Sequence, residues 1–392
     1  MLENHGYSLS VRYVFLLFVL CFVTLSCRAK AEENDVIYFG QTAALGGPAQ
    51  ALGIGMNNGI LAAFKEFNAQ GGLNGKKLEI KAYDDGYEPD RAIENTKKLI
   101  KEDNVFAMIG GVGTPTASAI EPIRSEEKVP FIGPFTGAEF LRNPHKRYVV
   151  NVRGSYWQET EEWIERLTTD LGIKRIAILY QDDSYGRAGL SGVERALKKR
   201  NLELVAEGAY KRNTTAVKSA VLKIRKAKPE AVVMVGAYKP CAEFIRVAKK
   251  VGMDPLFVNI SFVGSDALAK ELGDDGDGVI ISQVVPFPFT PEKNKLVAAY
   301  QNALASYSPD VDFGFVSLEG YLVGRVVIEI LKNVTGGITR ETFLDTLYEM
   351  KDLMIEDISL HYGDGDNQGL DDVFLTVLER GNTFKHIDKI AQ

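Results

Sequence analysis

Side chains that could carry out covalent or acid–base chemistry are few and scattered in this sequence of 392 residues. It contains no HExxH, CxxC or P-loop GK[ST] motif, the common metal-binding, redox and phosphate-binding signatures. Cys241 follows Pro240 at an expected helix start, a position that can lower the pKa of a thiol. No histidine lies near it in sequence to act as a base; the four are His5, His145, His361 and His386. We therefore expect no catalytic residues, no metal site and no cofactor.

Paired acidic residues are the next candidates for chemistry. Asp84-Asp85 and Asp182-Asp183 each follow an expected strand, where carboxylates could bind a metal ion or an amine. Helix capping and solvated turns explain the same positions, and we favour that interpretation. The stretches 274–277 and 363–367 resemble fragments of a calcium loop but lack its spacing and terminal glutamate. We interpret both stretches as turns.

Small polar and aromatic side chains at strand–helix junctions form the most informative group. Each alone is expected to cap a helix or to pack in the core. Ligands of open α/β sheets, however, bind beyond the carboxyl ends of the strands, where a common cleft would gather such residues. The candidates are Thr114, Thr116, Phe135, Thr136, Gly137, Asp183, Tyr185, Tyr238, Ser261 and Phe262. Together they predict a site that holds a small molecule without changing it.

The elements that would position these residues alternate between strand and helix. Residues 36–75 read as an apolar strand, a glycine-rich loop and a helix, whose exposed N–H groups favour the negative end of a ligand. Continuous apolar runs such as Val105 to Ile109 are typical of strands buried on both faces. A second series of strands and helices begins after Arg153-Gly154-Ser155. The periodicity predicts an α/β fold of two doubly wound, mostly parallel lobes.

The last third of the chain is expected to return to the first lobe. Helical patterns at 291–307, 314–333 and 340–350 follow the second series, and Tyr321 to Leu331 is too apolar for an isolated helix. We assign residues 1–31 to a signal peptide. The N-terminal lobe then comprises 32–153 with 285–363, and the C-terminal lobe comprises 154–284 with 364–392.

The N-terminal region has the pattern of an export signal. Arg12 precedes the apolar run Val14 to Val23, which is short for a membrane span, and Ala29-Lys30-Ala31 fits an A-x-A cleavage site. A lipobox-like stretch, Thr24 to Cys27, offers an alternative in which Cys27 carries a lipid anchor. Cleavage after Ala31 would leave 43 basic and 51 acidic residues, a net charge of −8. That charge argues against nucleic acid or an anionic membrane as partner, and the single remaining cysteine excludes an internal disulfide.

Five motifs occur in a specific order along the chain: GGPAQALG, FNAQGGLNGKKLEIKAYDD, IGGVGTPTASA, VPFIGP and ILYQDDSYGRAG. In this order they resemble the type I periplasmic solute-binding proteins of the leucine/isoleucine/valine-binding family, the receptor components of ABC importers. The resemblance covers essentially the whole chain after the signal peptide.

The resemblance implies ligand contacts in the first lobe. Thr114 matches the helix start whose hydroxyl and backbone N–H groups hold the ligand carboxylate in that family. Phe135, Thr136 and Gly137 match a second set of contacts after the VPFI strand. Leu52 stands where amino-acid receptors often have a tryptophan.

In the second lobe the resemblance implies closing contacts and one departure. Tyr185 matches the tyrosine that closes over the ligand, and Tyr238 matches an aromatic residue after the next strand. Ser261 falls where leucine-type receptors have a glutamate that pairs with the ligand ammonium. Either another acid such as Asp183 takes that role, or the ligand is not an ordinary α-amino acid. With Phe262 and the other aromatic candidates nearby, a flat or aromatic carboxylate is plausible.

The expected function is therefore capture of a small carboxylated solute in the periplasm by hinged closure, followed by presentation to an inner-membrane ABC permease. Three crossings, near Arg153 to Ser155, Val284 to Pro286 and Gly363 to Gly369, would form the hinge. We expect a monomer with no nucleic-acid partner. A ligand-sensing accessory protein for a receptor or chemoreceptor is the alternative, and an exported hydrolase would need a catalytic constellation that the sequence does not offer.

Overall fold

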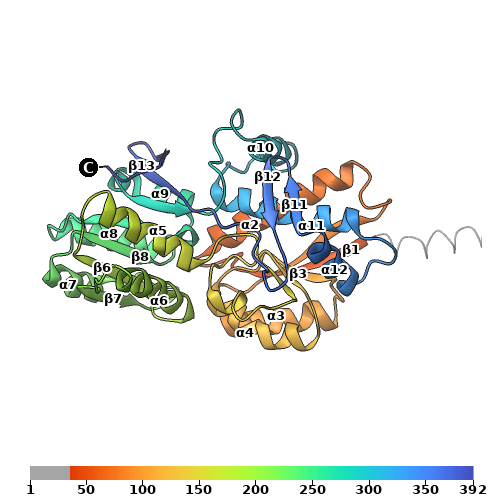
Figure 1. The fold of residues 1–392 in the computed structure, drawn as a ribbon, viewed down its shortest axis with the longest axis horizontal. Coiled ribbons are helices and arrows are strands. Elements are labelled where there is room, and N and C mark those ends of the chain that lie inside the picture. The colour runs from red at the N-terminus through yellow and green to blue at the C-terminus, as the bar shows by residue number, and fades with distance from the viewer. Residues whose placement is uncertain (1–35, 392) are drawn as a thin grey trace, which may run out of the picture.

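Two α/β lobes lie side by side and are joined by three segments of chain (Figure 1). The structure, a computed structural model, describes residues 36–391. The predicted signal peptide and the alternative anchor at Cys27 lie outside the described residues. Both lobes are built on mainly parallel sheets with flanking helices, so the predicted fold class is confirmed.

The first lobe contains a parallel sheet with the strand order β2-β1-β3-β4-β5. Its register places Val36 of β1 opposite Lys77 of β2 and Met108 of β3 opposite Phe131 of β4. The central strands are short. They are apolar because helices cover both faces of such a sheet. The strands are β1 (Val36–Ala43), β2 (Lys77–Asp84), β3 (Ala107–Ile109), β4 (Phe131–Ile132) and β5 (Val149–Val150).

Helices from both ends of the chain cover this sheet. They are α2 (Gln50–Ala69), α3 (Pro89–Lys101), α4 (Thr114–Glu126), η1 (Glu139–Leu141), α10 (Lys295–Tyr307), α11 (Phe315–Asn333) and α12 (Arg340–Met350). The apolar helix α11 packs directly on α2. A Cβ at Gly59 would lie 2.0 Å from the Ser317 carbonyl oxygen, and one at Gly320 would lie 2.4 Å from that of Met56. Glycine on both helices thus allows their backbones to touch, and the apolar surface of α11 is buried there.

The second lobe contains a larger sheet with the strand order β14-β13-β10-β9-β8-β6-β7. Its strands are β6 (Ile176–Gln181), β7 (Ala206–Tyr210), β8 (Ala231–Val235), β9 (Leu256–Asn259), β10 (Ile280–Gln283), β13 (Phe374–Glu379) and β14 (Thr383–Ile387). Its helices are α5 (Tyr156–Thr169), α6 (Ser184–Lys198), α7 (Lys218–Ala227), α8 (Tyr238–Lys250), η2 (Ser261–Val263), α9 (Ser265–Leu272) and η3 (Gly273–Gly276).

The C-terminal strands are the main difference from the sequence-based expectation, which gave no strand after residue 283. Strands β13 and β14 form an antiparallel pair that extends the second sheet at β10. The hairpin of β11 (Asp352–Ile355) and β12 (Ile358–His361) lies with the first lobe (Figure 1). Antiparallel edge strands carry a weaker hydrophobic signal than central parallel strands, which explains why the pattern missed them.

The first and third segments that cross between the lobes, near residues 151–152 and 367–370, are hydrogen-bonded to each other. Asn151 donates its backbone N–H to Asn367 at 2.8 Å, and Gly369 and Leu370 donate to Asn151 and Val152 at 2.9 and 3.0 Å. These extended segments lie between the two sheets, as Figure 1 shows. They form a short paired strip that can bend without breaking either sheet. The predicted lobe boundaries at residues 153, 284 and 363 stay a prediction.

Over residues 36–391, no helix is both long and apolar enough to cross a membrane.

Candidate ligand-binding site

A buried cluster lies where the carboxyl ends of the two sheets meet. Helix α4 begins there at Thr114, preceded by Gly113 with a φ of 106°. A Cβ at Gly113 would lie 2.1 Å from the ring of Tyr87, so only glycine fits this turn. The hydroxyl oxygens of Thr114 and Thr136 are 2.7 Å apart, and both residues are buried. One hydroxyl of such a pair donates to the other, which leaves the second proton for a ligand.

Two more polar side chains come from the first crossing. Arg153 donates from Nε and Nη2 to the carboxylate of Glu319, each at 2.9 Å. Its Nη1 atom and the hydroxyl of Tyr156 are buried and make no hydrogen bond to any residue in the range 36–391. The backbone N–H of Tyr156 donates to Gly137 at 2.7 Å, and a Cβ at Gly137 would lie 2.5 Å from the tyrosine ring. Glycine at position 137 therefore permits the close approach of Tyr156.

The electrostatic environment keeps both of these groups as donors. Burial raises the pKa of Tyr156 to about 12, against the opposing effects of Arg153 and of the hydroxyls of Thr136 and Thr114. Burial disfavours the charge of Arg153, but the carboxylates of Glu319 and Glu159 outweigh it and hold the pKa of the guanidinium above its usual value. At neutral pH the cluster thus contains a protonated phenol beside the two threonine hydroxyls, and a charged guanidinium whose Nη1 has no partner among residues 36–391.

Aromatic rings form the wall beside these donors. Phe262, in η2 of the second lobe, has its ring centroid 5.3 Å from that of Phe135 and 6.0 Å from that of Tyr87, both in the first lobe. The ring of Tyr185, at the start of α6, lies 4.5 Å from Phe262. The guanidinium of Arg153 lies 4.5 Å from the ring centroid of Phe135, within the range of a cation–π contact. We call Thr114, Thr136, Arg153, Tyr156, Phe135, Tyr185 and Phe262 the inner cluster.

Ser261, beside Phe262, binds an acid from another element. Glu159 of α5 accepts hydrogen bonds from the Ser261 N–H and hydroxyl, each at 2.9 Å, and from the hydroxyl of Ser282. Burial raises the pKa of Glu159, although Arg153 and these hydrogen bonds oppose the rise. The carboxylate is therefore occupied by hydrogen bonds within the protein.

A second set of side chains bridges the lobes nearer the surface. Arg212 of the second lobe binds Glu88 of the first at 2.8 Å and Asp183 of its own lobe at 3.0 Å. Asn213 donates to the Gly86 carbonyl at 3.0 Å and to Glu88 at 2.7 Å. We call Glu88, Asp183, Arg212 and Asn213 the rim. Its polar groups pair across the cleft and hold the lobes together without a ligand.

This geometry agrees with the known proteins that the chain resembles. A family model described as "Periplasmic binding protein" matches residues 36–382. The chain belongs to this family. The matching relatives identify it as a type I periplasmic binding protein of the leucine/isoleucine/valine group, a class that binds solutes and is not enzymatic, so the predicted absence of enzyme activity is confirmed.

Three relatives illustrate the similarity of this binding protein to others. It is 25% identical over 337 residues to Leu/Ile/Val-binding protein homolog 7 of Brucella abortus (strain 2308), which covers 82% of each chain. It is 23% identical over 277 residues to the leucine-specific-binding protein of Salmonella typhimurium, covering 71% of this chain and 74% of the relative. The crystal structure of a possible leucine/isoleucine/valine-binding protein from Rhodopirellula baltica SH 1 is 38% identical, with a TM-score of 0.86, covering 90% of this chain and 96% of that one.

The predicted site residues of the binding protein divide between the inner cluster and other roles. Thr116 donates back to the Gly113 carbonyl of its own turn at 3.0 Å, so its hydroxyl is already used. Leu52 is fully buried, and its side chain packs against Gly264 of the other lobe. The Tyr238 hydroxyl lies 3.5 Å from the backbone nitrogen of Ala51, which also links the lobes.

Asp183 belongs to the rim and caps a helix. Its carboxylate accepts from the Tyr185 N–H at 3.0 Å, from Gln181 at 2.7 Å and from Arg212. The capping interpretation of Asp182-Asp183 thus describes Asp183 in the structure.

Sequence reasoning treated Arg153 as part of the hinge and did not single out Tyr156, Tyr87, Gln181 or Arg212. Tyr87 and Gln181 meet across the cleft, with the Gln181 amide donating to the tyrosine hydroxyl at 3.2 Å. Gln181 is the last residue of β6 and Tyr87 lies three residues beyond β2, so the rule that selected the other candidates would have found them.

A cavity of about 500 Å³ opens between the lobes next to the rim. Tyr87 and Gln181 line it, and the Tyr87 ring also contacts Phe262, so the cavity adjoins the inner cluster. Its other walls come from both lobes: Gly47, Pro48, Ala49, Asn213, Thr214, Thr215, Ala237, Lys239 and Pro240.

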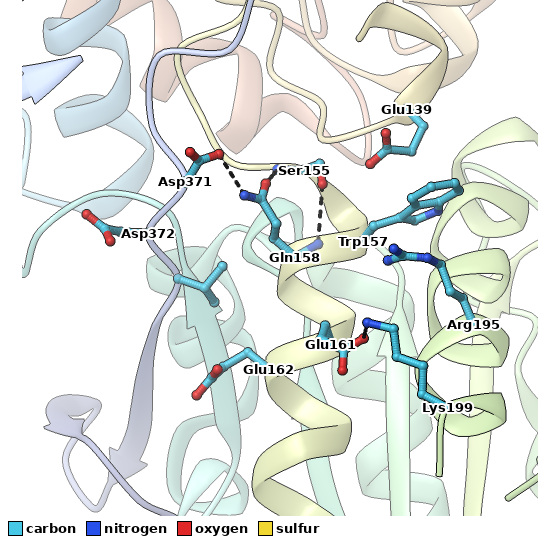
Figure 2. A pocket seen from close by; sticks show the side chains of 11 residues that line it. Glu139, Ser155, Trp157, Gln158, Glu161, Glu162, Arg195, Lys199, Asp371 and Asp372 are labelled. Atoms are coloured by element: carbon cyan, nitrogen blue, oxygen red, sulfur yellow. Dashed lines mark hydrogen bonds and ion pairs between the residues drawn. The ribbon is translucent and has the colours of Figure 1, made fainter. Parts of the chain in front are cut away.

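A second hollow, of about 520 Å³, lies outside this cleft along α5 and the third crossing (Figure 2). Its polar walls are largely paired within the protein. Glu161 binds Lys199 at 2.7 Å, Gln158 binds Asp371 at 2.7 Å, and the guanidinium of Arg195 lies over the Trp157 ring. We assign no ligand to this hollow.

Two further expectations concern metal and thiol chemistry. Within residues 36–391, no cluster of three or more His, Cys, Asp or Glu side chains could hold a metal ion. The idea that a helix start lowers the pKa of Cys241 is wrong. Helix α8 begins three residues earlier, at Tyr238, and burial raises the pKa of the fully buried thiol.

Proposed function

We propose that this protein is the extracytoplasmic receptor of an ABC importer, and that it captures a small carboxylated organic solute between its lobes. The observation that carries the proposal is the start of helix α4, where Thr114 and Thr136 form a buried hydroxyl pair at the interface of the two lobes. Backbone N–H groups at a helix start and a free hydroxyl proton suit a carboxylate. The three crossings support closure of the lobes around the solute.

Branched-chain aliphatic amino acids are expected to bind poorly. An enclosed ammonium group needs a carboxylate or several acceptors, because its desolvation is costly. Ser261 supplies no charge, and the nearby acids Glu159 and Asp183 already accept hydrogen bonds from the protein. A flat or aromatic acid without an ammonium group is the better candidate for the inner cluster.

The proposal is tested by a thermal-shift screen against amino acids, aromatic acids and short-chain acids. A solute that binds the folded state raises the melting temperature by mass action. Small-angle scattering with the best solute should then give a profile at least as compact as that of the ligand-free protein. Tight binding of leucine, isoleucine or valine in calorimetry would contradict the expected selectivity but leave solute capture intact.

Export and oligomeric state form the outer part of the proposal. The protein would reach the periplasm by a signal peptide cleaved after Ala31, or alternatively carry a lipid on Cys27. Mass spectrometry of the N-terminus of protein from the native host separates the two. Light scattering should report a monomer, and co-purification with a membrane permease would favour transport over sensing.

A further inference from the structure

The inner cluster contains two donors that the fold itself leaves unused. Arg153 is 1% exposed and Tyr156 is fully buried, yet Nη1 of the first and the hydroxyl of the second have no partner between residues 36 and 391. A buried donor without an acceptor destabilises the folded state. A ligand that brings acceptors to two such donors in one cluster would remove that cost.

The orientation of Arg153 is fixed by its neighbours. Glu319, on α11, holds Nε and Nη2 in a bidentate pair, which leaves Nη1 as the free edge of the guanidinium. Glu319 thus acts as a positioning residue. Thr114 and Thr136 both influence the Tyr156 hydroxyl, so the threonine pair and the two unused donors belong to one polar patch.

The charge around the patch also favours an anion. Arg142 is buried beside Arg153 and donates to its carbonyl oxygen at 3.0 Å, to the Ala138 carbonyl at 3.1 Å and to Gln368. It forms no ion pair within the described chain. The nearby carboxylate of Glu159 is hydrogen-bonded and its ionisation is disfavoured by burial. Glu139 and Glu159 favour the charged form of Arg142, and a negative ligand group would stabilise the two buried guanidinium groups further.

We propose that Arg153 and Tyr156 are specificity-determining residues of the solute site, and that they bind the carboxylate of a flat, apolar acid without an ammonium group. This inference rests on the proposed function. Phe135 lies under the Arg153 guanidinium and faces Phe262 of the other lobe at a centroid distance of 5.3 Å. Opening the hinge separates these two rings, and the body of the acid enters between them while its carboxylate reaches the polar patch.

The test uses flat monocarboxylates, namely benzoate, 4-hydroxybenzoate and cinnamate, with their primary amides and L-leucine as matched probes. Melting curves at constant ionic strength select the acid that binds most tightly, and calorimetry measures its affinity. We expect the acid to bind and its amide and leucine to bind at least tenfold more weakly, about the effect of one hydrogen bond to a charged group.

Tyr156→Phe separates a ligand contact from a structural role. The hydroxyl meets no partner in hydrogen-bond geometry within residues 36–391, and the Thr114 and Thr136 hydroxyls are its polar neighbours, so its removal should change the melting temperature little. The affinity for the acid should fall about tenfold. The matched control is Tyr300→Phe. The Tyr300 hydroxyl is buried outside the inner cluster, accepts from the Gly314 N–H at 2.9 Å and lies 2.6 Å from the Ser317 hydroxyl. That control should lower the melting temperature without changing the affinity.

Arg153→Met combined with Glu319→Leu removes the guanidinium without leaving a lone buried carboxylate. This double variant should fold and lose the preference for the acid over its amide. An acid that binds the wild type and Tyr156→Phe equally would overturn the inference and leave the proposed function standing. Binding of leucine would do the same. Binding only of solutes without a carboxylate would overturn both the inference and the carboxylate specificity of the proposed function. If no solute in the broad screen binds, the proposed function itself fails and the inference falls with it.

Discussion

The inner cluster and the rim both join the two lobes, but they differ in how their polar groups are satisfied. At the rim, Arg212 and Asn213 pair with Glu88 across the cleft, and each partner is partly exposed to solvent. In the inner cluster, Nη1 of Arg153 and the hydroxyl of Tyr156 are buried without an acceptor at hydrogen-bond geometry among residues 36–391. Partly exposed ion pairs contribute little energy each, whereas buried groups contribute or cost several times more. We therefore expect the rim to bias the lobes toward closure, and we propose that the inner cluster determines which solute is retained.

The largest effect should follow from breaking the buried ion pair of the inner cluster. Arg153→Met leaves the carboxylate of Glu319 buried and unpaired, which should lower the free energy of unfolding by about 3–5 kcal/mol. Denaturant unfolding of the ligand-free protein measures it. Adding Glu319→Leu should recover most of the loss. Arg380→Met removes the exposed pair with Asp277 and serves as the control, with a change of about 1 kcal/mol or less. Equal losses in the two single variants would show that the inner pair is no more important than a surface pair.

The next effect concerns affinity. Thr114→Val removes one hydroxyl from the buried pair with Thr136, and the affinity for a bound acid should fall about tenfold to a hundredfold, or 1.5–3 kcal/mol. Calorimetry with the acid selected in the screen measures this change. Thr168→Val is the matched control, since the Thr168 hydroxyl donates only within its own helix α5. Unchanged affinity in Thr114→Val would remove Thr114 from the site.

Breaking the rim should change the conformation more than the stability. Arg212→Ala deletes the bridge between Glu88 and Asp183, which is expected to cost about 0.5–1 kcal/mol. Because that bridge favours closure, the ligand-free variant should have a larger radius of gyration in small-angle scattering. The affinity for a solute should fall only a few fold. Arg187→Ala, which breaks an exposed pair with Asp182 inside one lobe, should leave the scattering profile unchanged.

The last effect is a pH dependence at another contact between the lobes. Asp266 of α9 accepts a hydrogen bond from the Phe315 N–H, at the start of α11 in the other lobe, at 3.1 Å. Burial raises its pKa from 3.8 to about 6, with Lys270 opposing and Asp312 supporting the rise. An acid whose pKa is raised by folding stabilises the fold most at low pH, and the contribution is lost as the pH rises through about 6.

Asp266→Asn removes this titration. The difference in melting temperature, variant minus wild type, should therefore increase between pH 4 and pH 7, by an amount equivalent to about 1 kcal/mol after allowance for solvent screening. Scanning calorimetry over this range provides the measurement. The exposed Asp274→Asn should give a difference that does not depend on pH in the same way. A constant or falling difference for Asp266→Asn would contradict the assignment.

The candidate site was predictable to the extent that it follows the ends of regular strands. Thr114 and Thr136 come after β3 and β4, which are neighbours in the parallel sheet, so their meeting follows from strand order. Tyr185 and Phe262 follow strand ends in the second lobe for the same reason. Arg153 was missed as a contact because it lies in a crossing between the lobes, and Tyr156 was missed because it is the first residue of helix α5.

Amino-acid patterning by itself determined the alternating strands and helices, the two-lobed α/β class and the absence of catalytic motifs, because these depend on local period and residue type. The tertiary structure decided which side chains face each other across the cleft. Arg153 and Glu319 are 166 positions apart and become a buried pair only when α11 packs on α2 and the first crossing passes over it. Likewise, the Ser261 hydroxyl bonds to Glu159, which lies on another element, α5. Burial and hydrogen bonding, and not distance in the sequence, determine what a polar group can bind.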